Sequence, residues 1–79
     1  MVEAAKRDLS TRTGTPVDAI EVVRVEEMEW SDAALGCPQP GQMYAQVIVP
    51  GYRIILRAAG TSYQYHTDMD SQVILCQNP

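Results

Sequence analysis

The 79-residue sequence contains no phenylalanine, one tryptophan, one histidine and two cysteines. It also lacks an apolar run close to the roughly 20 residues of a membrane-spanning helix. Basic residues are scarce, because six Lys and Arg face ten Asp and Glu and leave a net charge of −4. Nucleic acids and anionic membrane surfaces both require a basic protein face. We therefore expect neither as a partner, and no membrane span within this segment.

The N-terminal residues also lack the pattern of a secretion signal. MVEAAKRDL has no basic stretch followed by an apolar one. The rest of the composition, 46% hydrophobic and 20% charged, is that of a folded globular chain. We expect a single domain over 1–79, excised from a longer exported protein and too small to be very stable unless a covalent link supports it.

Residue spacing predicts one helix near the N-terminus. Apolar residues lie three to four positions apart over 2–13, Gly14 stands where a helix ends, and Pro16 prevents the helix from resuming. The rest of the chain is rich in β-branched and aromatic residues, which favour strands.

Predicted strands occupy 19–30, 43–49, 52–58, 61–67 and 72–76. The alternation within 19–30 is interrupted, so we expect either a β-bulge near 24–27 or partial cover on both faces. Pro50-Gly51 predicts a bulged hairpin or a corner, and Ala59-Gly60 a tighter hairpin. The fold class is α+β, with one N-terminal helix packed on a mostly antiparallel sheet of about five strands.

Cys37 and Cys76 are the only cysteines, too few for a typical zinc site. A bond between them would close a loop of about 40 residues and contribute roughly 4 kcal/mol. We expect this disulfide, which would indicate an exported protein. Two buried free thiols are the alternative.

The segment WSDAALGCPQPGQMY, residues 30–44, is a catalytic loop, a binding loop or a structural clasp. We expect a clasp, with Cys37 as its anchor and Trp30 packed beneath it. Prolines stiffen the segment and so lower the ordering cost of binding. A possible binding loop is therefore formed by Leu35, Pro38, Gln39 and Pro40.

Four tyrosines form a possible aromatic surface, Tyr44, Tyr52, Tyr63 and Tyr65, because tyrosine is favoured in protein interfaces. The alternative is that these rings fill the core and cross-strand positions of a chain without phenylalanine.

Histidine and carboxylates alternate at His66, Asp68 and Asp70, as a metal site on one face of a strand would require. A polar turn after His66 explains the same residues, because an aspartate bonds nearby backbone N–H groups there. We expect the turn, with no metal and no cofactor. The serines lack a nucleophile motif and the chain has little room for an enclosed pocket, so we expect no enzyme.

Several motifs together carry a resemblance: W-x-D-A-x-L-G-C-P-x-P-G at 30–41, P-G-Y-R-I at 50–54, Y-x-Y-H-T-D at 63–68 and the closing Cys76. This pattern resembles a small bacterial domain of unknown function that occurs in exported proteins and lipoproteins. The resemblance spans nearly the whole chain. It implies an extracytoplasmic location (secreted, periplasmic or anchored at the cell surface) and a paired cysteine, but no activity. The element order is also similar to PepSY-like domains, which accompany secreted proteases and can inhibit them.

These observations predict a non-catalytic accessory or interaction domain whose partner is a protein or the rest of its own parent chain. One alternative is an inhibitor or chaperone-like module that inserts the 35–41 loop into a secreted protease, which requires an exposed Leu35. Another is a metal- or small-ligand-binding module at His66, Asp68 and Asp70, which requires the three side chains to converge.

Overall fold

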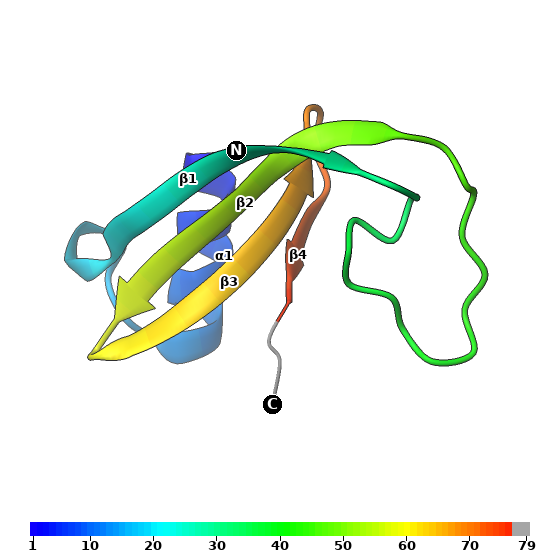
Figure 1. Cartoon of the computed structure of the whole chain (residues 1–79). Coiled ribbons are helices and arrows are strands. Elements are labelled where there is room, and N and C mark those ends of the chain that lie inside the picture. The colour runs from blue at the N-terminus through cyan, green and yellow to red at the C-terminus, as the bar shows by residue number, and fades with distance from the viewer. Residues whose placement is uncertain (77–79) are drawn as a thin grey trace.

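The molecule consists of one α-helix packed across a four-stranded antiparallel sheet (Figure 1). The computed structural model describes residues 1–76. Its elements are α1 (Val2–Thr13), the short 3-10 helix η1 (Val17–Ala19), β1 (Glu21–Trp30), β2 (Val49–Ala58), β3 (Thr61–Asp68) and β4 (Val73–Leu75). The strands lie in the order β1-β2-β3-β4. The predicted α+β class is confirmed, with four strands in residues 1–76 against about five expected.

α1 has the predicted bounds because its C-terminus is encoded locally. Gly14 adopts a φ of 76°, the left-handed conformation that glycine tolerates best, and donates its N–H to the Ser10 carbonyl at 2.8 Å. Pro16 then holds the chain extended, with a φ of −58° and a ψ of 143°. Within residues 1–76, neither α1 nor η1 has the length and apolarity that crossing a membrane requires.

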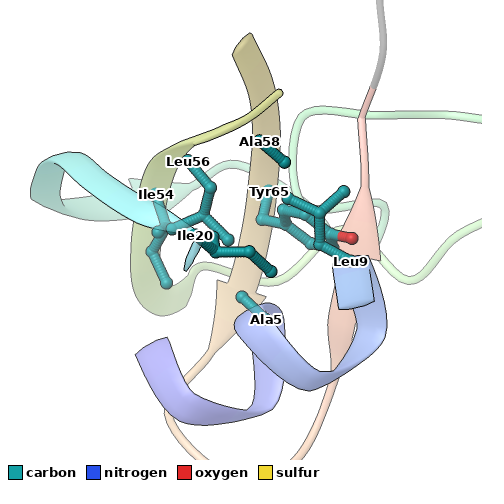
Figure 2. Packing of buried hydrophobic residues seen from close by; sticks show 7 residues of the cluster. All are labelled: Ala5, Leu9, Ile20, Ile54, Leu56, Ala58 and Tyr65. Atoms are coloured by element: carbon teal, nitrogen blue, oxygen red, sulfur yellow. The ribbon is translucent and has the colours of Figure 1, made fainter. Parts of the chain in front are cut away.

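The hydrophobic core lies between α1 and one face of the sheet. Its buried members are Ala5, Leu9, Ile20, Ile54, Leu56, Ala58 and Tyr65 (Figure 2). Tyr65 is fully buried, and its hydroxyl donates to Asp8 Oδ2 at 2.8 Å, so the phenol is paired as well as packed. Each large apolar side chain in this layer stabilises the fold by roughly 1.5–3 kcal/mol.

Strand alternation divides the sheet into a face toward α1 and a face away from it. Ile54 lies opposite Tyr65 in the register of β2 and β3, and both face the helix. Arg53 lies opposite His66, and these residues face away. The predicted hairpin at Ala59-Gly60 joins the two strands; its φ values of 51° and 80° are those of a two-residue turn with two left-handed positions.

β1 contains the expected bulge, placed slightly earlier than predicted. Val22 pairs with Leu56 and Arg24 with Ile55, so Val23 is the extra residue. After the bulge the strand brings Trp30, at its end, to the face away from α1. The alternative of cover on both faces does not hold along β1, because Val22, Val23 and Val25 are exposed and only Trp30 of the strand is buried.

The predicted strand over 43–49 is wrong. Only Val49 belongs to a strand, as the first residue of β2, and residues 43–48 have no regular structure. The apolar and β-branched residues of this segment favour a strand, but β1 ends at Trp30 and leaves them no partner beside which to pair. The segment between β1 and β2 instead runs out beyond the sheet (Figure 1).

The turn predicted at Pro50-Gly51 is wrong as well, because both residues lie inside β2. Pro50 pairs with Glu29, and Gly51 pairs with Met28 on one side and Asp68 on the other. A Cβ atom at Gly51 would clash with the carbonyl oxygen of Thr67. Glycine is needed here for close approach of two strands rather than for a turn.

Gly51→Ala is therefore expected to destabilise the fold although alanine is small and tolerated in strands. The added methyl group meets backbone rather than a movable side chain, so β2 and β3 must separate locally, at a cost of roughly 1–3 kcal/mol. Urea denaturation of this variant measures the loss. Ser62→Ala, an exposed position of β3, is the control and should change stability little. Equal stability of the two variants would contradict the close approach of β2 and β3 at Gly51.

Candidate functional site

Residues 30–37 form a tight turn that covers the end of the sheet. Asp32 Oδ1 accepts the Ala34 N–H at 3.0 Å, and the Asp32 carbonyl accepts the Leu35 N–H at 3.2 Å. Leu35 and Gly36 both have positive φ, 56° and 72°. These two left-handed residues reverse the chain and return it to the sheet at Cys37.

Trp30 packs beneath this turn, as predicted. A Cβ atom at Gly36 would lie 2.7 Å from Trp30 Cζ3, so the backbone of the turn rests directly on the indole. The indole ring stacks on the His66 ring, with 4.4 Å between centroids and 21° between planes. Trp30 Nε1 donates to the Thr67 carbonyl at 2.9 Å. Trp30 is thereby tied to β3 by packing and by a hydrogen bond.

His66 joins the turn to β3 through both ring nitrogens. Its Nδ1 lies 2.6 Å from the Leu35 carbonyl oxygen, which can only accept, so Nδ1 carries the proton and donates. Nε2 is then free to accept from Gln64 Nε2 at 2.7 Å. The arrangement satisfies a neutral imidazole completely.

A disulfide between Cys37 and Cys76 closes the same end of the fold. The two Cα atoms are 5.8 Å apart and the bond spans 39 residues. Both cysteines of the chain are paired, so the predicted disulfide is confirmed and the alternative of two free thiols is wrong. The bond is compatible with an extracytoplasmic location.

Burial lowers the pKa of His66 below its ordinary value of 6.5. The hydrogen bond to the Leu35 carbonyl favours the charged form, but it does not offset burial, and the positive charge of Arg53 opposes protonation further. The folded protein therefore holds His66 neutral at a pH where the unfolded chain already binds a proton.

Stability should accordingly fall as the pH decreases through about 6.5, the pKa of an unfolded histidine. Above that value both states are neutral and the contribution of His66 is constant. The chain has one histidine, so a single imidazole NMR resonance reports its titration. We expect a midpoint below 6.5 in the folded protein and an ordinary midpoint in urea. A folded midpoint at or above the unfolded one would contradict the burial of a neutral ring.

His66, Asp68 and Asp70 do not form a common site. The His66 ring bonds within the covered turn, whereas Asp68 Oδ1 accepts the backbone N–H groups of Asp70, Ser71 and Gln72 at 2.9, 3.0 and 3.0 Å. This is the polar turn that the sequence also predicted. In residues 1–76, no three His, Cys, Asp or Glu side chains are grouped as a metal ion would require.

The four residues of the expected binding loop separate into two groups. Leu35 is buried, with 1% of its surface exposed, and packs with the covered turn. Pro38, Gln39 and Pro40 are exposed. Trp30 is buried too. The burial of Leu35 and Trp30 counts against insertion of the 35–41 loop into a protease cleft, because both side chains pack within the fold.

The tyrosines do not share one surface. Tyr65 is buried under α1, and Tyr52 and Tyr63 pack against the same core. Tyr44 lies in the loop, where its hydroxyl accepts the Gln39 N–H at 3.0 Å. Three of the four rings therefore fill the core, the alternative that the absence of phenylalanine suggested.

The largest exposed apolar side chains lie in a segment that the sequence assigned to the sheet. Met43 is 96% exposed, Ile48 71% and Val47 55%. We call residues 43–48 the apolar segment. Residues 38–42 separate it from the disulfide-bonded Cys37, and β2 follows it directly. The sequence did not reveal this exposure, because apolar and β-branched residues favour a strand that packs in the sheet.

A family model matches nearly the whole chain. The family model described as "Domain of unknown function (DUF8738)" matches residues 2–76. Neither a curated protein nor a solved structure matches the chain. The expected assignment to a domain of unknown function is confirmed, whereas the motif pattern, the occurrence in exported bacterial proteins and the likeness to PepSY-like domains stay predictions.

Proposed function

The chain belongs to the DUF8738 family of domains of unknown function, and we propose that it is a non-catalytic interaction domain that binds another protein through the apolar segment. The observation that carries this proposal is the exposure of Met43, Val47 and Ile48 on the chain between the disulfide-bonded Cys37 and the start of β2. Apolar side chains exposed together in a folded domain are typical of interaction sites.

The covalent and aromatic contacts on the N-terminal side of the segment support this role. The disulfide and the stack of Trp30 on His66 hold residues 30–37 to the sheet, and β2 begins at Val49. The segment between them therefore has two fixed ends, which limits the entropy it loses on binding. Pro38 and Pro40 restrict the backbone further.

The partner we propose is a protein or another part of the parent chain, in the extracytoplasmic space of a bacterium or in a lipoprotein. The disulfide supports this compartment, because such bonds persist where the environment is oxidising. The net charge of −4 argues against nucleic acid as the partner.

A photoreactive amino acid placed at Met43 tests this proposal in cells that produce and export the protein. We expect an adduct of defined mass from position 43 and none from position 62, where Ser62 is exposed on the sheet. Val47→Ser with Ile48→Ser should remove the adduct while leaving the denaturation midpoint nearly unchanged, since both side chains are exposed. Identical adducts from both positions, or none from position 43, would overturn the proposal.

A further inference from the structure

A different surface, the free edge of β1, carries a second recognition site. We infer that β1 binds an extended, basic polypeptide segment by strand addition along Arg24 to Trp30. Within residues 1–76, β1 is hydrogen-bonded to β2 alone, so one side of the strand has no neighbour. The backbone N–H and C=O groups on such a side are available to a partner strand.

The geometry of β1 limits the site to the part after the bulge. Val23 interrupts the register, whereas the seven residues from Arg24 to Trp30 pair continuously with β2 from Ile55 to Val49. A partner strand needs this regular spacing to form consecutive hydrogen bonds.

Two hollows border β1, and each is also lined by a residue of β2. One, of about 300 Å³, is lined by Met1, Val2, Val25 and Tyr52. The other, of about 440 Å³, is lined by Glu27, Met28, Glu29, Pro50 and Met69. Val25, Glu27 and Glu29 occur at every second position of β1 and therefore share a face. The edge thus offers one apolar position followed by two acidic ones.

The charges of β1 favour a basic partner. The strand carries four glutamates and one arginine. Glu26 Oε1 forms an ion pair with Arg53 Nη2 at 2.8 Å, and Glu21 Oε1 lies 4.0 Å from Arg57 Nη1. Glu27 and Glu29 are exposed and form no ion pair within residues 1–76. They are available to lysine or arginine from outside.

Charge also disfavours a second copy of this chain on the same edge. Two β1 strands placed side by side would bring eight glutamates and two arginines together, twice the content of one strand. Like charges in adjacent strands destabilise the pairing. A strand with lysine or arginine at alternate positions would instead be attracted to these glutamates. The edge therefore favours a basic segment.

A designed peptide provides the probe: capped Thr-Lys-Thr-Lys-Thr-Val-Thr, which in antiparallel register places its lysines opposite Glu29 and Glu27 and its valine opposite Val25. The comparison peptide has both lysines replaced by glutamate. In NMR titrations we expect the lysine peptide to shift backbone amides of 24–30. We expect the glutamate peptide to leave them unchanged. Added salt should weaken the binding.

Glu27→Lys with Glu29→Lys is expected to weaken binding of the lysine peptide at least ~10-fold and to allow binding of the glutamate peptide. The control variant, Glu3→Lys with Asp18→Lys, has the same change in net charge, but both residues lie outside β1. Its affinity for the lysine peptide should therefore fall less. Denaturation midpoints confirm that both variants fold.

Equal binding of the two peptides, or no shift in 24–30, would overturn the inference. Shifts of these amides with protein concentration alone would overturn it in favour of a second copy. The apolar segment is not involved, so a variant with serine at Met43, Val47 and Ile48 should bind the lysine peptide as the native chain does. The outcome therefore does not depend on the function proposed for that segment.

Discussion

Replacement of Cys37 and Cys76 by serine is expected to lower the free energy of unfolding by about 4 kcal/mol, one of the two largest effects expected for this fold. The bond spans 39 residues, and without it the unfolded chain regains the conformations that this closed loop forbids. A domain of this size has a total stability of roughly 4–12 kcal/mol. Loss of the bond should therefore remove at least about a third of the total stability.

Urea denaturation of the oxidised protein, the reduced protein and the double serine variant measures this effect. Reduced protein and variant should agree, because each lacks the same bond. The single Cys76→Ser variant controls for the remaining thiol and should lose a similar amount. A loss below about 1 kcal/mol would show that Trp30 and the hydrogen bonds alone hold the turn.

Trp30→Ala is expected to lower stability by about 3–5 kcal/mol, as for other buried large aromatic side chains. The indole packs under Gly36, stacks on His66 and donates to the Thr67 carbonyl at 2.9 Å. Its removal leaves a cavity between the turn and β3 and exposes the histidine. The contacts on both sides of the ring are lost together.

Trp30→Phe separates packing from hydrogen bonding. It keeps an aromatic ring over His66 and loses the Nε1 donor, so we expect a smaller cost, mainly the roughly 1–3 kcal/mol of an unpaired buried carbonyl. Circular dichroism follows the unfolding, since both variants lack the only tryptophan. The His66 pKa should rise toward its ordinary value in Trp30→Ala because burial is what lowers it. An unchanged His66 pKa would contradict the claim that Trp30 buries the histidine ring.

The parts of the fold that the sequence predicted correctly depend on local signals. α1 ends at Thr13 because Gly14 and Pro16 follow it, and the β2–β3 hairpin depends on Ala59-Gly60. The disulfide followed from the presence of only two cysteines in a small chain. The helix end and the hairpin required no knowledge of a distant residue, and the disulfide, which joins distant residues, had only one possible pairing.

The errors all involve a partner far along the chain. The apolar and β-branched residues of 43–48 predict a strand, but a strand needs a neighbour, and β1 ends in the 30–37 turn instead. Gly51 belongs to a strand because of its contact with Thr67, which its neighbour Pro50 does not reveal. The bond from His66 to the Leu35 carbonyl spans 31 residues, and no local pattern indicates it.

Hydrogen exchange of the backbone amides tests the central claim, that residues 30–37 are held to the sheet while 43–48 are exposed. Leu35 and Cys37 donate backbone hydrogen bonds within the turn, whereas none of residues 43–48 donates one within the described chain. We expect slow exchange at Leu35 and Cys37, fast exchange throughout 43–48, and loss of the slow class on reduction. Slow exchange at alternate residues of 43–48 would instead indicate a paired strand and contradict the account.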